Sequence, residues 1–297
     1  MRVIYGWILF LIAIAVIMGG GLSVAVLLGI AAYMAGREYL NITRTRGIRP
    51  SARIVLGMTI AFFVVAGLPA VPGLNLSWNF SIEHFPILLT VGICSAFLRL
   101  LLRNEKPPAT IADIATTILG FIYIGWMPSH LVLLRNLSLP GMEKISNPLQ
   151  QPGLAYVWAS LFIIWASDVF AYYVGKNYGK HLLFPQVSPK KTVEGAIGGI
   201  VAAVFFATLV VYLSDNYLFP CRPFDGKLWQ APLMGLVVSL AGQFGDLCES
   251  LLKRDAGVKD SGSLIPGHGG FLDRGDSMIF GVAVSYYWIC MVVLGLL

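Results

Sequence analysis

Charged residues are scarce in this sequence. The 297-residue chain is 12% charged and 57% hydrophobic, whereas soluble globular domains carry about 25% charged residues. So few charges cannot cover a soluble surface, and the same figures exclude disordered and coiled-coil classes. The apolar residues form long unbroken runs and do not alternate with polar ones as in a transmembrane β-barrel. The sequence therefore predicts an all-α, polytopic integral membrane protein.

Cysteines are also few and widely separated. The four are Cys94, Cys221, Cys248 and Cys290. Because no Cys-x-x-Cys pair and no Cys/His cluster occurs, neither a zinc site nor a disulfide framework is expected. The net charge is +6, but the basic residues lie in the gaps between apolar runs and not on a soluble domain. A nucleic acid is therefore not expected as a partner.

Nine apolar runs approach the length of about 20 residues that a membrane helix needs. They cover residues 3–18, 20–36, 54–70, 85–102, 109–127, 153–175, 195–214, 229–252 and 277–296. The apolar stretch 127–135 is too short to span and is expected to be interfacial or re-entrant. We expect residues 1–150 to form lipid-facing scaffold helices. Residues 151–297 should form a catalytic part with cytoplasmic loops 176–194 and 253–277.

The basic residues are distributed unevenly between the two sides of these spans. With a cytoplasmic N-terminus, 17 of the 21 Lys and Arg residues lie on the cytoplasmic side and 4 on the other. Cytoplasmic loops of membrane proteins carry such an excess of positive charge. We therefore expect a cytoplasmic N-terminus in a cell (inner) membrane, with the candidate functional segments facing the cytoplasm.

One carboxylate lies inside an apolar run. Asp168 is several residues within 153–175, where an ionisable group is costly and is a functional candidate by default. Asp168, Tyr172 and Gly175 are spaced so that they share one helix face. The alternative explanation is an aspartate that pairs with a lysine of another helix for packing.

A second candidate segment precedes the run that begins at residue 195. Thr192 or Ser188 could cap the next helix, with Glu194 in its first turn. Lys190 and Lys191 are unfavourable at a helix start unless an anion binds there. A basic pair beside the membrane is also common by charge asymmetry alone, so this segment by itself is a weak signal.

The strongest segment runs from residue 242 to residue 277. One polar stripe on its predicted helix consists of Gln243, Asp246, Ser250 and Lys253. Asp273 and Asp276 are three residues apart at the start of the last run and project the same way. A loop rich in glycine and proline separates them from the stripe.

These residue types are suited to a site for phosphate and metal. Asp246, Asp273 and Asp276 supply the hard oxygen ligands that Mg²⁺ prefers. Phosphate charge could be neutralised by Lys253, Arg254, Lys259 and Arg274. The glycines of 266–270 let the backbone approach an oxyanion closely, and His268 either contacts a phosphate or holds the loop. The set favours phosphoryl or nucleotidyl transfer, in which catalysis is mainly positioning and charge neutralisation.

A long motif in this segment resembles a known family. It reads Ser250-x-x-Lys253-Arg254-x4-Lys259-Asp260-x-Gly262-x-x-Ile265-Pro266-x-His268-Gly269-Gly270-x-x-Asp273-Arg274-x-Asp276. It is closely similar to the signature of the phosphatidate cytidylyltransferases (CDP-diacylglycerol synthases), and the segments 168–175 and 188–195 resemble other parts of that family. The likeness covers about residues 160–297. Gly275 stands where the family usually has an apolar residue, but both aspartates are in place.

The resemblance implies a reaction of CTP with phosphatidic acid, at the bilayer, that gives CDP-diacylglycerol and pyrophosphate. It implies that the catalytic residues are Asp246, Asp273, Lys253 and Arg274. It implies that the ligands of Mg²⁺ are Asp246, Asp273 and Asp276, with Asp168 either an additional ligand or a residue that orients the ligands. It implies substrate or phosphate contacts from Ser188, Lys190, Lys191, Thr192, Glu194, Ser250, Arg254, Lys259, Asp260, His268, Gly269 and Gly270. The site could hold Mg²⁺ alone or Mg²⁺ with a second, monovalent ion.

Other functions share parts of this pattern. A CTP-dependent lipid alcohol kinase, or a cytidylyltransferase for another lipid phosphate, would use the same metal–CTP site. A transporter would use Asp113, Asp168 and Asp246 as coupling carboxylates, but the inverted repeats that would favour it are absent from the sequence. Gly195 and Gly199 form a GxxxG pattern typical of close helix packing, and small-residue helix faces of this kind make a homodimer plausible.

Overall fold

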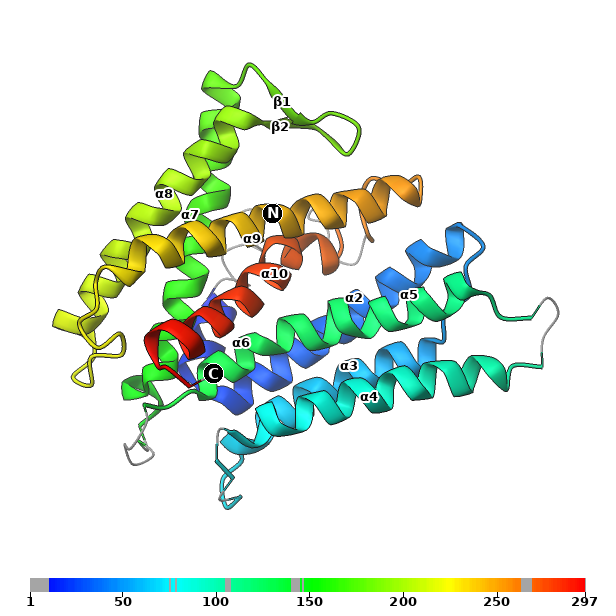
Figure 1. The fold of residues 1–297 in the computed structure, drawn as a ribbon, viewed down its shortest axis with the longest axis horizontal. Helices are drawn as coiled ribbons and strands as arrows, with labels where there is room; N and C mark the ends of the chain where they lie inside the picture. Colours follow the sequence, from blue (N-terminus) through cyan, green and yellow to red (C-terminus); the bar gives the residue numbers. More distant parts are fainter. Residues whose placement is uncertain are drawn as a thin grey trace. The chain divides into compact units, whose positions relative to one another are not determined.

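The computed structural model describes residues 11–74, 76–77, 79–104, 108–139, 145, 147–262 and 269–296. This part of the chain is almost entirely helical (Figure 1). Eight of its helices are long and apolar enough to cross a membrane, and they coincide with eight of the nine predicted spans. The predicted first span, 3–18, lies partly outside the described residues, and its described part, 11–18, is helical.

The elements follow one another with short connections. The first four described spans are α2 (Gly21–Thr45), α3 (Ala52–Gly67) with the turn η1 (Leu68–Ala70), α4 (Asn79–Leu101), and α5 (Ile111–Phe121) continued by η2 (Ile122–Trp126) and α6 (Met127–Asn136). The turn η3 (Pro148–Gln150) precedes α7 (Pro152–Tyr178), the strands β1 (Leu182–Phe184) and β2 (Ser188–Thr192), and α8 (Val193–Leu213) with η4 (Ser214–Leu218). The last two spans are α9 (Gln230–Asp255) and α10 (Leu272–Trp288), the latter extended by η5 (Ile289–Val293).

Residues 127–135 do not form a separate interfacial or re-entrant segment, so that prediction is wrong. They belong to α6, which α5 and the π-helical turn η2 join into one continuous span over 111–136. His130 and Arg135, which interrupt the apolar run, are buried at 1% and 0% exposure. The Arg135 Nε donates a hydrogen bond of 2.9 Å to the Ile17 carbonyl oxygen. Polar side chains satisfied in this way inside a bundle do not end a span.

The chain divides into two compact units. The first comprises Met1–Asn136 with Leu252–Gly275, and the second comprises Leu137–Leu251 with Asp276–Leu297. Helices α9 and α10 therefore each contribute to both units. The predicted division near residue 150 into scaffold and catalytic helices concerns function, and it stays a prediction.

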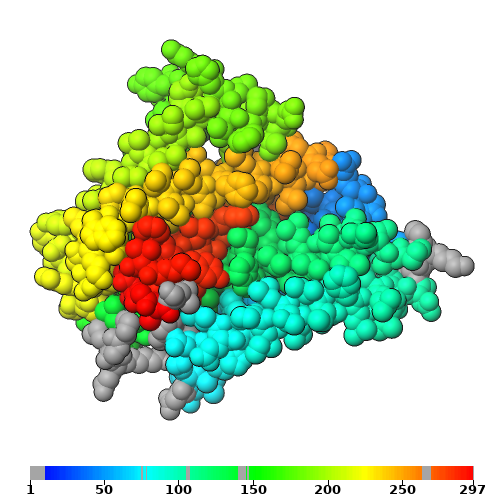
Figure 2. Space-filling view, in the orientation of Figure 1, coloured from blue at the N-terminus to red at the C-terminus, as the bar shows by residue number. Residues whose placement is uncertain are grey.

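The core of the first unit is aromatic. Phe62 and Phe121 are fully buried, with ring centroids 6.5 Å apart, and Phe62 meets Phe85 edge to face at 5.3 Å. The helices approach closely at Gly120, where an added Cβ would lie 2.8 Å from the Tyr39 ring. Figure 2 shows α4 (cyan) and α5 (green) packed along each other on the visible face.

Asp113 has a structural role in the first unit. It is 2% exposed and completes a capping box with Thr110 at the start of α5. Its carboxylate also accepts a hydrogen bond of 2.6 Å from the Arg49 backbone N–H. A capping box satisfies backbone N–H groups that the helix itself leaves unpaired. These contacts explain why a carboxylate is buried at this position. A transporter would instead use this carboxylate for ion coupling.

Helices α7 and α8 form the framework of the second unit. They run side by side and are joined at one end by the antiparallel hairpin β1–β2 (Figure 1). Two glycines of α8 allow this approach, because an added Cβ at Gly195 would lie 2.7 Å from the Ala171 carbonyl oxygen. At Gly199 it would lie 2.7 Å from the Ser167 carbonyl oxygen. The predicted close packing at this GxxxG pattern is confirmed.

We expect Gly199→Ala to lower the free energy of unfolding by about 1–3 kcal/mol, because the methyl group would overpack the α7–α8 contact. Gly57→Ala in α3 is the matched control, since a Cβ there meets nothing within 4 Å and alanine favours helix more than glycine. Thermal unfolding of both variants in the same detergent makes the comparison. Equal shifts in Tm would show that the α7–α8 contact is not tight.

Candidate active site

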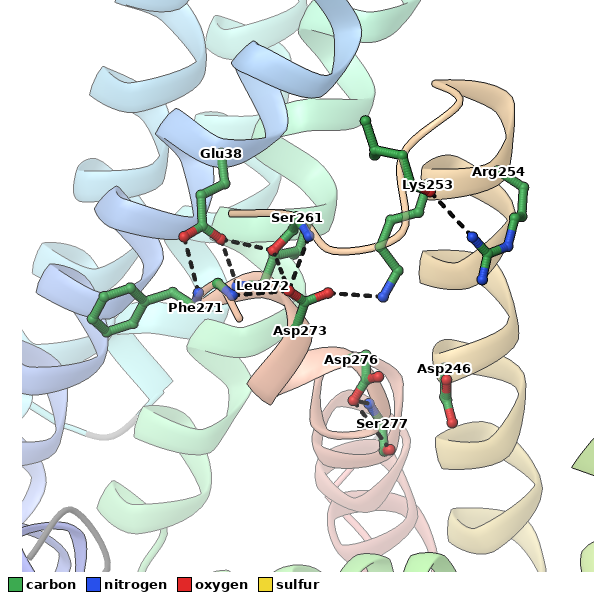
Figure 3. Close-up of polar contacts among 12 residues, drawn as sticks. Glu38, Asp246, Lys253, Arg254, Ser261, Phe271, Leu272, Asp273, Asp276 and Ser277 are labelled. Carbon is green, nitrogen blue, oxygen red and sulfur yellow. Dashed lines mark hydrogen bonds and ion pairs between the residues drawn. The ribbon is translucent and has the colours of Figure 1, made fainter. Parts of the chain in front are cut away.

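A cavity of about 680 Å³ lies in the second unit, among α7, the hairpin, α8, α9 and α10. Three carboxylates from three different helices line it: Asp168, Asp246 and Asp276. Asp276 and Asp246 lie on neighbouring helices (Figure 3), which approach closely because an added Cβ at Gly245 would lie 2.7 Å from the Asp276 carbonyl oxygen. The volume is within the range of about 300–1,000 Å³ typical of small-molecule sites.

The hairpin supplies positive charge to this cavity. Lys190 and Lys191 line it together with Ser188 and Thr192, all from β2. The Lys191 Nζ lies 2.5 Å from the Asp246 Oδ2, and these side chains are 27% and 30% exposed. The predicted basic pair and the predicted stripe aspartate, which are far apart in the sequence, therefore meet. Their partial exposure leaves both groups accessible to a ligand.

The start of α8 is fixed by two residues of the predicted segment. The Thr192 Oγ1 accepts a hydrogen bond of 3.1 Å from the Gly195 N–H, so Thr192 caps the helix as predicted. The Glu194 carboxylate accepts hydrogen bonds from the backbone N–H groups of Lys180 and His181, at 3.0 and 3.2 Å, and lies 2.6 Å from the His181 Nδ1. Glu194 thus anchors the hairpin to α8, while a substrate contact for it stays a prediction.

Asp168 occupies the face of α7 that the sequence predicts. Tyr172 and Gly175 line the same cavity, so the shared helix face is confirmed. The Ser277 side chain of α10 hydrogen-bonds to the Asp168 carboxylate, and the Ser277 N–H donates to Asp276 at 2.8 Å. Ser277 therefore links two of the cavity carboxylates, a role that no sequence motif indicates.

Gln243 is a second residue whose role the sequence does not specify. It lines the cavity, and its Nε2 donates a hydrogen bond of 3.1 Å to the Ala196 carbonyl oxygen. The same nitrogen lies 3.2 Å from the Ser239 Oγ and 3.3 Å from the Ser167 Oγ. Gln243 therefore ties α9 to both α7 and α8 at the cavity wall.

A second polar cluster lies in the first unit, around Asp273 in the first turn of α10 (Figure 3). The Asp273 Oδ1 accepts a hydrogen bond of 2.8 Å from the Lys253 Nζ. The Asp273 Oδ2 accepts from the N–H groups of Ser261 and Gly270, at 2.9 and 2.8 Å, and lies 2.9 Å from the Ser261 Oγ. The Lys253 and Asp273 side chains are only 12% and 10% exposed. The structure thus brings these two predicted catalytic residues together as a largely, but not fully, buried ion pair.

Glu38 completes this cluster and is absent from the residues that the sequence singles out. Its carboxylate accepts hydrogen bonds from Ser261 and from the start of α10 (Figure 3). The available signal is that Glu38 is the one acidic residue in 37–53, a segment that also holds five arginines.

The other predicted residues that the structure describes do not line the cavity. Arg254 is exposed and donates a hydrogen bond of 3.3 Å to the Val258 carbonyl oxygen. Arg274, Lys259 and Asp260 are exposed, and Ser250 is half-buried on α9. Gly269 has a φ of +80° beside Asp273, and His268 lies outside the described residues.

In the described part of the chain, no group of three or more His, Cys, Asp or Glu side chains is close enough to hold a metal ion. The three carboxylates of the cavity still have the chemistry that Mg²⁺ prefers, because all their donors are hard oxygens. The predicted metal ligands therefore stay predictions.

The sequence model of the cytidylyltransferase family matches residues 1–292. The chain belongs to this family. It is 34% identical over 305 residues to the phosphatidate cytidylyltransferase of Synechocystis sp., covering 98% of this chain and 96% of the relative. It is 36% identical over 239 residues to the phosphatidate cytidylyltransferase of Bacillus subtilis, covering 76% and 80%. It is 34% identical over 303 residues to phosphatidate cytidylyltransferase 4, chloroplastic, of Arabidopsis thaliana, covering 97% and 72%.

This cytidylyltransferase is thus a membrane enzyme of the nucleotidyltransferase class. Nucleotidyl transfer requires the charge of a triphosphate to be neutralised and its phosphates to be oriented. Lys190 and Lys191 lie in the cavity with Asp168, Asp246 and Asp276. That cavity is the active-site candidate of the cytidylyltransferase.

Proposed function

We propose that this cytidylyltransferase transfers CMP from CTP to phosphatidic acid, giving CDP-diacylglycerol and pyrophosphate. The observation that carries the proposal is the cavity of the second unit, which combines three carboxylates with two lysines among membrane-spanning helices. Such a site suits a reaction between a water-soluble triphosphate and a lipid in the bilayer. The names of the relatives support the choice of lipid.

In the proposed reaction a phosphate oxygen of the lipid attacks the α-phosphorus of CTP. A bond forms between that oxygen and the α-phosphorus, and the bond from the α-phosphorus to the oxygen that bridges to the β-phosphate breaks. Pyrophosphate leaves with the electron pair. No covalent nucleophile from the protein is needed, because a phosphate monoester with a second pKa of about 6 is already ionised at pH 7.

Lys190 and Lys191 would hold the phosphates of CTP. In the structure Lys191 pairs with Asp246, so binding of a triphosphate would exchange this carboxylate for a phosphate oxygen. The exchange keeps the lysine charge compensated and releases Asp246. Charge-assisted contacts to phosphate are among the stronger hydrogen bonds.

Asp246 and Asp276, with Asp168, would hold Mg²⁺, and Asp273 lies one helical turn before Asp276 on α10. Bound Mg²⁺ supplies neutralisation of the phosphate charge and polarisation of a phosphoryl oxygen. The protein residues orient these oxygens and keep the lysines beside them. We also propose that the site faces the cytoplasm from a cell (inner) membrane, since the excess of basic residues falls on the same side as these segments.

The test is a turnover assay with purified protein in detergent, phosphatidic acid, Mg²⁺ and CTP labelled in either the α- or the γ-phosphate. We expect the α-label to enter the lipid phase, the γ-label to appear in pyrophosphate, and EDTA to stop both. Transfer of the γ-label to a lipid alcohol, with release of CDP, would identify a kinase. Activity with another lipid phosphate but not with phosphatidic acid would correct the substrate.

A further inference from the structure

The Glu38 carboxylate lies against the start of α10, although Glu38 belongs to α2. Glu38 is 3% exposed. Its Oε1 accepts a hydrogen bond of 3.0 Å from the Phe271 N–H, and its Oε2 accepts one of 3.0 Å from the Leu272 N–H. The first N–H groups of a helix have no partner within the helix, and a negative charge beside them is stabilising. Glu38 therefore fixes where α10 begins.

Two glycines make room for this carboxylate. An added Cβ at Gly262 would lie 2.7 Å from the Glu38 Oε1, and one at Gly270 would meet both the Glu38 Oε2 and the Ser261 Oγ. Both positions belong to the motif that resembles the family signature. At these two glycines the backbone thus passes closely by a side chain that lies far earlier in the chain.

Ser261 connects Glu38 to Asp273. Its Oγ lies 2.9 Å from the Glu38 Oε2 and 2.9 Å from the Asp273 Oδ2, while its N–H also donates to the Asp273 Oδ2. A hydroxyl has one proton and can donate it to only one of the two carboxylates at a time. The hydroxyl therefore donates to one carboxylate at a time, while the Ser261 N–H keeps its bond to Asp273. Asp273 holds Lys253 through its other oxygen.

We propose that Glu38 is a positioning residue of the nucleotidyl transfer: through Ser261 and the start of α10 it holds the Asp273 carboxylate in the orientation that binds Lys253. This inference rests on the proposed function and on the catalytic role that the family resemblance implies for Asp273 and Lys253. Glu38 would act on Asp273 through Ser261. Removing a residue that orients a catalytic or metal-binding group typically lowers activity by about 10–100-fold.

The test compares Glu38→Gln and Ser261→Ala with the wild-type enzyme in the CTP assay, at several Mg²⁺ concentrations. We expect each variant to lower kcat by about 10-fold or more, to raise the Mg²⁺ concentration needed for half-maximal rate, and to leave the KM for phosphatidic acid within about 2-fold. Because the two residues act in one chain of contacts, the double variant should lose little more than either single variant.

Asp113→Asn is the matched control. Asp113 is also a buried carboxylate of the first unit that accepts backbone hydrogen bonds at a helix start, but the Asp273 cluster does not include it. This variant should lower Tm while kcat per folded molecule stays at the wild-type value. If Glu38→Gln behaves in the same way, Glu38 is only a structural anchor and the proposal is overturned.

The other outcomes of this experiment also decide the question. Should Glu38→Gln fail to fold, Ser261→Ala still tests the link, and a wild-type kcat in that variant would overturn the proposal. Effects of the two variants that multiply in the double variant would also overturn it, since they would act independently. Wild-type protein that forms no labelled lipid would overturn the proposed function as well, whereas an active wild type with normal kcat in Glu38→Gln removes the positioning role alone.

Discussion

Asp246→Asn should lower the rate of CMP transfer by at least about 100-fold, the usual size for removing one group that stabilises charge in a transition state. Asp246 lines the cavity from α9 and pairs with Lys191. The amide keeps the shape of the side chain but has no charge for Mg²⁺ or for Lys191. The loss should appear in kcat for CTP consumption, and added Mg²⁺ should restore little of it.

Asp225→Asn is a suitable control for this substitution. Asp225 also belongs to the second unit and also pairs with a lysine, at 3.0 Å from the Lys227 Nζ, but both side chains are largely exposed and lie outside the cavity lining. Its φ of +56° suits asparagine as well as aspartate. A comparable loss of activity in both variants would show that the effect is general and that Asp246 has no special role.

The sequence predicts the spans well because hydropathy can be read along the chain without knowing how the helices pack. A run of about 20 apolar residues has few alternatives to crossing the bilayer as a helix, and eight described spans coincide with predicted ones. The prediction for 127–135 is wrong for a related reason, since hydropathy along the chain does not show what a polar side chain contacts in the fold. Arg135 ends the apolar stretch but donates a hydrogen bond inside the bundle, and such compensation depends on a neighbouring segment that the local pattern does not reveal.

The sequence predicts the cavity residues only as separate segments. Asp168 and its helix face follow from helical spacing, and Thr192 follows from capping preferences. The contact between Lys191 and Asp246 depends on how α7, the hairpin and α9 pack. That packing requires the close approach at Gly195 and Gly199, which a GxxxG pattern indicates without naming the partner helix.

Glu38 shows what local patterns cannot supply. Its three hydrogen-bond donors lie 223 to 234 positions away along the chain. An acidic residue beside several arginines near a helix end is ordinarily explained by local charge balance. Only the folded position of α2 against Ser261 and the start of α10, within the first unit, identifies the groups that it binds.

Lys253→Met should have two effects that can be separated. It leaves the Asp273 carboxylate at 10% exposure without its ion-pair partner, and an uncompensated buried charge costs about 3–5 kcal/mol of stability. It also removes one of the predicted catalytic cations, so activity should fall by about 100-fold or more. Thermal unfolding and CTP turnover of the same preparation would measure both effects.

The double variant Lys253→Met/Asp273→Asn distinguishes them. Removing both charges eliminates the uncompensated carboxylate, and replacing a whole buried ion pair by uncharged residues is often close to neutral for stability. The carbonyl oxygen of the introduced amide can still accept from the Ser261 and Gly270 N–H groups that now bind Asp273. We therefore expect Tm to recover while turnover stays lost. Recovery of turnover together with Tm would mean that the Lys253–Asp273 pair only holds the loop to α9, and the catalytic charge would then have to come from Lys190 and Lys191 in the cavity.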